Sequence, residues 1–261
     1  MNKKIKLVGV WSDNFKNIYD IYNKSIEKYL DYFEVCLCKI DLKEFNVFGF
    51  GTPSWYEAAV QKLDFIIKNL NELREGELLV FNDLDIQYLN PMNTFRVLDF
   101  MECKKLDFCG TKEFDSDKYN GGYYILRNTK NIIKLICSIK EELKLKKPKY
   151  ADQDILNEII HDANVNHALM PREFFINGPH GGITQEAIMH HTTYADTVHD
   201  KIVQMKMIYS NYFKTKYAES DDFPFGDSFG ELNRTNGIKL TDDIYINDPF
   251  VLLKNKLLWN W

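Results

Sequence analysis

Hydrophobic positions along this chain switch repeatedly between the short apolar runs of buried strands and the 3.6-residue spacing of amphipathic helices. In residues 14–30, for example, Ile18, Tyr22 and Ile26 recur at a spacing that places them on one helix face. The same patterns predict strands at 5–12, 33–41, 77–81, 106–110, 122–126 and within 165–176, and helices at 14–30, 54–74, 91–104, 129–145 and 151–162. This alternation predicts an α/β fold, with helices on both sides of a mostly parallel central sheet.

The alternation weakens after Tyr217, where Gly, Asp, Asn and Pro become frequent. Apolar residues return only in the final FVLLKNKLLWNW. We therefore expect one domain over residues 1–216 and a C-terminal tail, 217–261, that packs on it. A chain of 261 residues with 45% hydrophobic content is long enough to bury a full core.

Charge and composition exclude several classes of protein. The 33 basic and 38 acidic side chains are spread along the chain without a basic stripe, so nucleic acid is not an expected partner. No apolar stretch of the sequence is long enough for a transmembrane segment, and the N-terminal apolar run is too short for a signal peptide. The five cysteines show no disulfide or metal-finger spacing. We expect a cytoplasmic protein of microbial or viral type.

Asp83 and Asp85 stand in LLVFNDLDIQYL, directly after a strand that we expect to be buried. Open α/β sheets place their ligands at the carboxyl ends of such strands. Two carboxylates this close repel each other unless a cation neutralises them, and Mg²⁺ or Mn²⁺ carrying a diphosphate would do so. The alternative is a turn or helix cap with two solvated aspartates, and the tripeptide alone leaves both open.

Two further segments could contact a sugar. ADQDILNEII opens a helix with Asp152 and Gln153, whose side chains could hold hydroxyl groups or lie beneath an anomeric carbon as positive charge develops. KYNGGYYILRNT places Asn120, Gly121 and Gly122 before a strand, where the backbone could approach a ligand closely. The alternatives are an ordinary acidic helix N-terminus and a plain turn.

The segment AIMHHTTYADTVHDKI contains His190 and His191 at the end of an apolar run, and Lys201 on a predicted helix. Imidazole can bind Mn²⁺, and a lysine ammonium suits phosphate. Neighbouring strand residues point to opposite faces, so at most one of the two histidines faces a site. We expect surface or packing roles for the others, which are His161, His167, His180 and His199.

Taken in order, these segments resemble the GT-A-type nucleotide-diphospho-sugar transferase family, retaining glycosyltransferases that include plant xylosyl- and arabinosyltransferases. The resemblance covers residues 55–201 and implies a single GT-A-type, Rossmann-like domain. It implies metal-dependent transfer of a hexosyl or pentosyl group from a nucleotide diphosphate sugar, UDP-sugar favoured. The acceptor would be a hydroxyl of a glycan or another molecule, and the anomeric configuration would be retained.

The resemblance also implies residue roles. Asp83, Asp85 and His191 would bind Mn²⁺ or Mg²⁺. The closing motif of the family resembles H-A-N-x-x-x-G-x-x-x-K, and only His191 puts Lys201 in register as a diphosphate contact, with Thr197 at the glycine position. Asp152 and Gln153 would lie beside the transferred sugar as the catalytic pair. The implied donor-binding residues are Lys62 near the phosphates or sugar, Asp83 near the ribose, Asn120, Gly121 and Gly122 around the sugar, and Val10, Trp11 and Ser12 at the base and ribose.

Two alternatives come from other classes. A sugar nucleotidyltransferase on a related fold would normally show a Gly-rich, basic segment near the first strand, and VGVWSDNF lacks one. A non-catalytic carbohydrate- or nucleotide-binding protein on an inactive transferase fold has no need to keep Asp83, Asp85, His191 and Asp152 together. Metal-dependent affinity for a nucleoside diphosphate would separate a transferase from a glycan-binding module.

Overall fold

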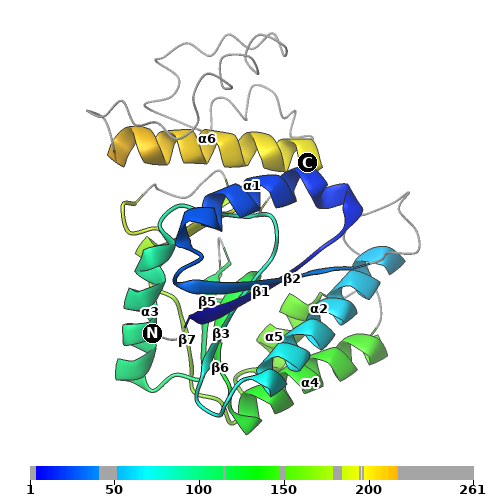
Figure 1. The fold of residues 1–261 in the computed structure, drawn as a ribbon. Coiled ribbons are helices and arrows are strands. Elements are labelled where there is room, and N and C mark those ends of the chain that lie inside the picture. Colours follow the sequence, from blue (N-terminus) through cyan, green and yellow to red (C-terminus); the bar gives the residue numbers. More distant parts are fainter. Residues whose placement is uncertain are drawn as a thin grey trace.

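A central sheet and a smaller second sheet organise the part of the chain that this computed structural model describes (Figure 1). The described residues are 4–40, 52–113, 116–146, 151–178, 184–193, 195 and 197–216. The strands of the central sheet are β1 (Ile5–Trp11), β2 (Phe33–Lys39), β3 (Leu78–Asn82), β5 (Phe108–Lys112), β6 (Tyr119–Arg127) and β7 (His167–Leu169).

Within the described residues the central sheet has six strands in the order β2-β1-β3-β6-β5-β7. Strand β6 runs antiparallel to both of its neighbours, β3 and β5, and the other neighbouring pairs are parallel. The predicted mostly parallel sheet is therefore confirmed. Because β1 and β3 are parallel neighbours, the segments that follow them, which carry predicted site residues, start at the same edge of the sheet.

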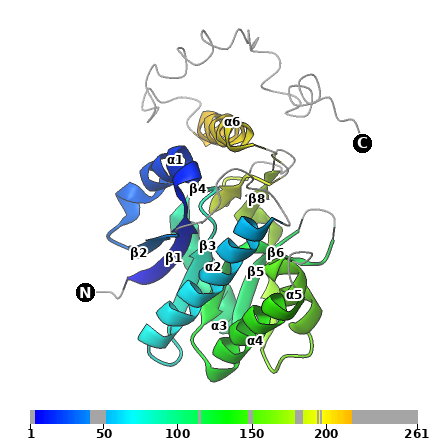
Figure 2. The ribbon, with the colours of Figure 1, turned by 90° about the vertical axis from the view of Figure 1, so that its right-hand side faces the viewer.

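Helices cover both faces of the central sheet (Figures 1 and 2). One face is covered by α2 (Pro53–Glu72), α4 (Lys130–Lys146) and α5 (Asp152–Ile159). On the other side lie α1 (Lys16–Ile26), α3 (Thr94–Lys104) and α6 (Val198–Lys216). Short 3₁₀ turns flank some of these elements, at Asp13–Phe15, Glu27–Tyr29, Pro91–Asn93 and Arg172–Phe174.

The strand residues alternate between two hydrophobic cores. Leu7 and Val80 are register partners that pack on the side of α1 and α3, whereas the next pair, Val8 and Phe81, packs on the side of α2 and α4. This two-residue alternation explains why β1 and β3 read as nearly continuous apolar runs, since both of their faces are buried. Each core removes apolar surface from water and so stabilises the sandwich.

The second sheet is small, and the hydrophobic pattern did not predict it. It consists of β4 (Ile86–Tyr88), β8 (Phe175–Asn177) and β9 (Met189–His191), in the order β4-β9-β8. Strands β4 and β9 are antiparallel, with Ile86 opposite His191. This pairing joins the segment after residue 184 to the segment that carries Asp83 and Asp85.

Three local predictions need correction or limits. The strand predicted within 165–176 is two strands, β7 and β8, which belong to different sheets. Asn120 lies inside β6 rather than in a turn before it, because β6 begins at Tyr119. The tail at 217–261 and His180 lie outside the described residues. Among the described helices, none combines the length and apolar character needed to cross a membrane.

Candidate active site

Asp83 and Asp85 lie in the short connection between β3 and β4, which is held from both sides. The backbone N–H of Asp83 donates to the carbonyl of Gly122 on β6 at 2.7 Å. On the other side, the backbone N–H and the hydroxyl of Thr192 each donate to the carbonyl of Asp85 at 3.0 Å. The Asp85 side chain is only 12% exposed, compared with 33% for Asp83. This degree of burial disfavours the alternative of two solvated aspartates.

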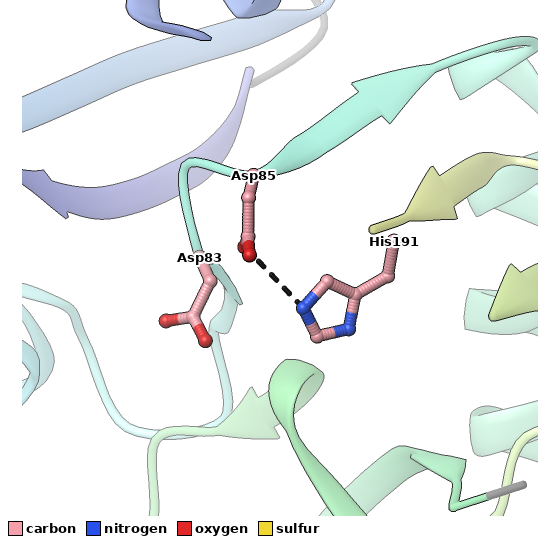
Figure 3. Close-up of side chains that lie close together, drawn as sticks. All are labelled: Asp83, Asp85 and His191. Atoms are coloured by element: carbon pink, nitrogen blue, oxygen red, sulfur yellow. Dashed lines mark ion pairs between the residues drawn. The ribbon is translucent and has the colours of Figure 1, made fainter. Parts of the chain in front are cut away.

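His191 comes to these carboxylates from β9 (Figure 3). Its Nε2 lies 3.3 Å from Oδ1 of Asp85, and one ligand atom from each of Asp83, Asp85 and His191 lies within 4.8 Å of the others. Carboxylate oxygens with one imidazole nitrogen fit a divalent cation. The neighbouring His190 is fully buried away from this group, with Nε2 3.3 Å from the carbonyl of Gly178. Of the two adjacent histidines, only His191 joins the acidic pair.

Gly122 lies directly against the imidazole of His191. A Cβ at this position would be 2.2 Å from Cε1 of the ring, far inside van der Waals contact. The family resemblance implies that this glycine lines the sugar pocket, and the contact with His191 gives a steric reason for it. Only the absence of a side chain leaves room for His191 beside Asp85.

Lys201, on α6, forms an ion pair with Asp85. Its Nζ is 2.5 Å from Oδ2 of Asp85 and 2.9 Å from the carbonyl of Thr192. The helix begins beside Thr197, whose hydroxyl accepts from the backbone N–H of Asp200 at 3.1 Å, while the Asp200 carboxylate accepts from the Thr197 N–H at 3.2 Å. This reciprocal cap fixes the start of α6, one turn before Lys201. Burial opposes ionisation of Asp85, but Lys201 and His191 outweigh it and hold the pKa of Asp85 well below its usual range.

Lys62, on α2, is a buried cation between two carboxylates. Its Nζ is 2.6 Å from Oδ2 of Asp152 and 3.5 Å from Oδ1 of Asp83, and it donates to the carbonyl of Gly121 at 3.2 Å. Burial lowers the pKa of Lys62, but the charges of Asp152 and Asp83 outweigh burial and raise it above its ordinary value. Burial raises the pKa of Asp83, against the effect of Lys62, and the charge of Asp85 raises it further. A bound divalent cation would relieve the repulsion between Asp83 and Asp85.

A hydrogen-bonded group that includes Glu113 lies next to Lys62 and Asp152. The amide nitrogens of Asn120 and Gln153 both donate to Oε2 of Glu113 at 2.9 Å. The amide oxygen of Gln153 accepts from the N–H of Gly121 at 2.7 Å, so its side chain is held at both ends. Glu113 was not among the predicted site residues, because a single acidic residue in a polar segment gives no local signal.

One cleft of about 860 Å³ collects all the predicted site residues. Its lining includes Trp55 and Ala58, which precede Lys62 on α2 and were not among the predicted site residues. At the end of β1, the ring of Trp11 stacks on Tyr19 with centroids 4.5 Å apart. The predicted residues that line the cleft are Val10, Trp11, Ser12, Lys62, Asp83, Asp85, Asn120, Gly121, Gly122, Asp152, Gln153, His191 and Lys201.

Comparisons with solved structures agree with this architecture. The chain is 12% identical to a glycosyltransferase involved in glycosylation of the major capsid of PBCV-1, with a TM-score of 0.58 over 78% of this chain and 100% of that one. GlyE from Streptococcus pneumoniae TIGR4 is 12% identical, with a TM-score of 0.51 over 85% of this chain and 67% of GlyE. The bifunctional glycosyltransferase WbbM is 12% identical, with a TM-score of 0.52 over 78% of this chain and 50% of WbbM. These similarities establish the GT-A fold.

Sequence comparison identifies the family. No curated protein matches the chain in sequence. Residues 20–218 match the nucleotide-diphospho-sugar transferase family, and this match includes Lys62, the Asp83–Asp85–His191 group and Lys201. The protein is therefore a glycosyltransferase that belongs to the nucleotide-diphospho-sugar transferase family.

Proposed function

We propose that the protein transfers a hexosyl or pentosyl group from a nucleotide diphosphate sugar, with UDP as the favoured nucleotide, to a hydroxyl of a glycan or another acceptor. The observation that carries the proposal is the convergence of Asp83, Asp85 and His191 with Lys62 and Lys201 at one cleft. Three potential metal ligands and two ammonium groups together suit a diphosphate, which is negatively charged and binds divalent cations. The family resemblance favours retention of the anomeric configuration.

Asp83, Asp85 and His191 are the residues that would hold the metal ion. Such an ion supplies charge stabilisation to the departing nucleotide diphosphate. We favour Mn²⁺ over Mg²⁺ because Mg²⁺ is a hard cation that prefers oxygen ligands, and His191 offers nitrogen. Lys201, already beside Asp85, would contribute a compact positive charge to the diphosphate.

The sugar end of the donor would lie beside Asp152 and Gln153. Lys62 fixes the Asp152 carboxylate through the 2.6 Å ion pair, and Glu113 fixes the Gln153 amide. A carboxylate held in this way can stabilise positive charge that develops at the anomeric carbon. The remaining proposed donor contacts are Asn120, Gly121 and Gly122 near the sugar, and Val10, Trp11 and Ser12 near the base and ribose.

The test is donor turnover by the purified protein. In the presence of Mn²⁺, at least one of a set of UDP- and GDP-sugars should release its nucleotide diphosphate. Asp85→Asn should abolish this release because it removes a metal-ligating charge. Asp117→Asn is the matched control, since Asp117 is 91% exposed and pairs only with Lys112 among the described ion pairs.

Each result has a separate meaning. Activity that survives in Asp85→Asn would remove the metal role from the proposal. Calorimetry with UDP, with and without Mn²⁺, tests donor binding independently of turnover. Mn²⁺-dependent UDP binding without turnover of any donor would favour a non-catalytic nucleotide-binding protein, and no affinity for any nucleoside diphosphate would favour a scaffold.

A further inference from the structure

Asn82 is the last residue of β3 and directly precedes Asp83, and its side chain is completely buried. Its amide nitrogen donates to the backbone carbonyl of Asp83 at 3.0 Å. Its amide oxygen accepts from the hydroxyls of Tyr22 and Tyr88, at 3.1 and 3.2 Å. The Asp83 carbonyl can only accept a hydrogen bond, so the nitrogen of the amide must face it.

The groups around this amide prevent it from turning away. Tyr22 comes from α1 and Tyr88 from β4, and their rings pack edge to face with centroids 5.8 Å apart. On the β1 side, a Cβ at Gly9 would lie 2.8 Å from the backbone carbonyl oxygen of Asn82 and 3.3 Å from the nitrogen of its side-chain amide. The Asn82 amide is therefore held between three elements that belong to the hydrophobic core.

Strand stability does not account for an asparagine at this position. Residues 78–81 of the same strand are all apolar, asparagine is depleted in strands, and burying an amide is costly unless it is fully hydrogen-bonded. What the asparagine adds is a donor to the Asp83 carbonyl, which a leucine or phenylalanine cannot provide. With the bond from the Asp83 N–H to Gly122, both backbone polar groups of Asp83 are then fixed.

We propose that Asn82 is a positioning residue that holds the Asp83–Asp85 turn in the conformation in which both carboxylates converge with His191 on one cation. The inference rests on the metal site of the proposed function. Hydrogen-bonding partners that orient metal ligands typically change metal affinity by about 10–100-fold when they are removed. Asn82 would act on the backbone that carries the ligands rather than on the ligand atoms.

The test compares Mn²⁺ affinity with folding stability in a variant that removes the whole polar group. The triple variant Tyr22→Phe/Tyr88→Phe/Asn82→Leu removes the two tyrosine hydroxyls and the asparagine amide together, so of this group only the part-buried carbonyl of Asp83, whose donor is under test, loses its partner. We expect its free energy of unfolding to stay close to that of the wild type, while its Mn²⁺ dissociation constant, measured by calorimetry without nucleotide, rises about tenfold or more.

Two further variants make the result decisive. Tyr22→Phe/Tyr88→Phe keeps the bond from Asn82 to Asp83, and its Mn²⁺ affinity should stay within about twofold of wild type if that bond is what matters. Asn82→Ala removes the same donor, leaves space for a water beside the tyrosines, and should weaken Mn²⁺ binding as the triple variant does. If either variant that lacks the amide binds Mn²⁺ as tightly as wild type, the inference is wrong. If the wild-type protein itself does not bind Mn²⁺, the proposed metal site fails instead.

Discussion

The backbone of Gly122 packs against the imidazole of His191 so closely that a single methyl group at this position would lie 2.2 Å from the ring carbon Cε1. Gly122 also accepts the hydrogen bond from the N–H of Asp83. One glycine on β6 therefore sets the position of two of the three potential metal ligands. The ring and the turn reach it from strands that are far apart in the sequence.

The first prediction follows from this contact. Gly122→Ala should displace the His191 ring and raise the Mn²⁺ dissociation constant about tenfold or more, because the imidazole can no longer reach the carboxylates. The measurement is Mn²⁺ calorimetry in a double-mutant cycle with His191→Ala. In the His191→Ala background the methyl group has no ring to displace, so Gly122→Ala should then have little further effect. Equal effects in both backgrounds would show that the contact does not control metal binding.

A second prediction concerns Lys201, whose ammonium lies 2.5 Å from the Asp85 carboxylate. A cation that approaches Asp85 is repelled by this ammonium, whereas a diphosphate is attracted by it. Lys201→Met should therefore tighten Mn²⁺ binding in the absence of nucleotide severalfold and weaken UDP binding in the presence of Mn²⁺. Calorimetry of both reactions measures whether the Mn²⁺ affinity and the UDP affinity change in opposite directions.

Lys206→Met is the matched control for this prediction. It removes the same charge from α6, but Lys206 does not line the cleft. We expect little change in either reaction, because Lys206 is a partly buried lysine that does not line the cleft where the cation and the diphosphate would bind. If Lys201→Met weakened Mn²⁺ binding as well, Lys201 would not compete with the cation.

The sequence predicted those parts of the site that depend on local pattern. Asp83 and Asp85 follow an apolar strand directly, so their place at the sheet edge could be read without coordinates. Lys62 and Lys201 lie on helices, but their convergence was implied by family resemblance and not by periodicity. In the structure these lysines pair with different carboxylates, Lys62 with Asp83 and Lys201 with Asp85.

The parts that were missed depend on contacts between distant segments. The second sheet consists of three-residue strands, too short to give a two-residue period, and its pairing of Ile86 with His191 is visible only in three dimensions. Glu113 accepts hydrogen bonds from Asn120 and Gln153, and the Asn82 amide bonds to the Asp83 carbonyl and two tyrosines; no local pattern in the sequence records such bonds. The steric role of Gly122 requires the position of a ring from another strand.

A third prediction concerns the buried ion pair between Lys62 and Asp152. Lys62→Met should destabilise the protein by about 3–5 kcal/mol, because it leaves buried carboxylates without their cation. Denaturant unfolding without metal measures this loss. Lys62→Met/Asp152→Asn should recover part of the stability, since the second change removes one of the uncompensated charges.

Lys140→Met is the control, because its pair with Asp64 lies at the surface, where such pairs contribute about 0–1 kcal/mol. Equal losses for both lysines would contradict the central role of Lys62.

The last prediction is a pH dependence of folding that comes from His190. Burial, and to a smaller extent the charge of His191, lower the pKa of His190 from 6.5 to about 3. The unfolded chain therefore binds a proton at a pH where the folded protein does not. The contribution of neutral His190 to stability is fully present above pH 6.5 and is lost as the pH falls towards the folded pKa. Between pH 6.5 and pH 5 the loss should be about 1.6 kcal/mol, because proton uptake by the unfolded chain rises from half a proton to nearly one over this range and one proton is worth 1.36 kcal/mol for each pH unit.

Replacing His190 with glutamine isolates this effect. Glutamine does not titrate, and its amide nitrogen can still donate towards the carbonyl of Gly178, the acceptor 3.3 Å from the His190 ring. The side chains that influence the pKa of the ring are Gln204 on α6, His191 on the same strand and Asp85 in the connection between β3 and β4, and the variant leaves all three in place. The measurement is urea unfolding in the presence of EDTA, repeated between pH 5 and pH 7.5. The change in the free energy of unfolding with pH should be smaller in His190→Gln than in the wild type, by an amount that corresponds to up to about one proton taken up on unfolding. If the pH dependence of the free energy of unfolding is the same in His190→Gln as in the wild type, His190 takes up no proton on unfolding. Other groups would then cause the acid sensitivity.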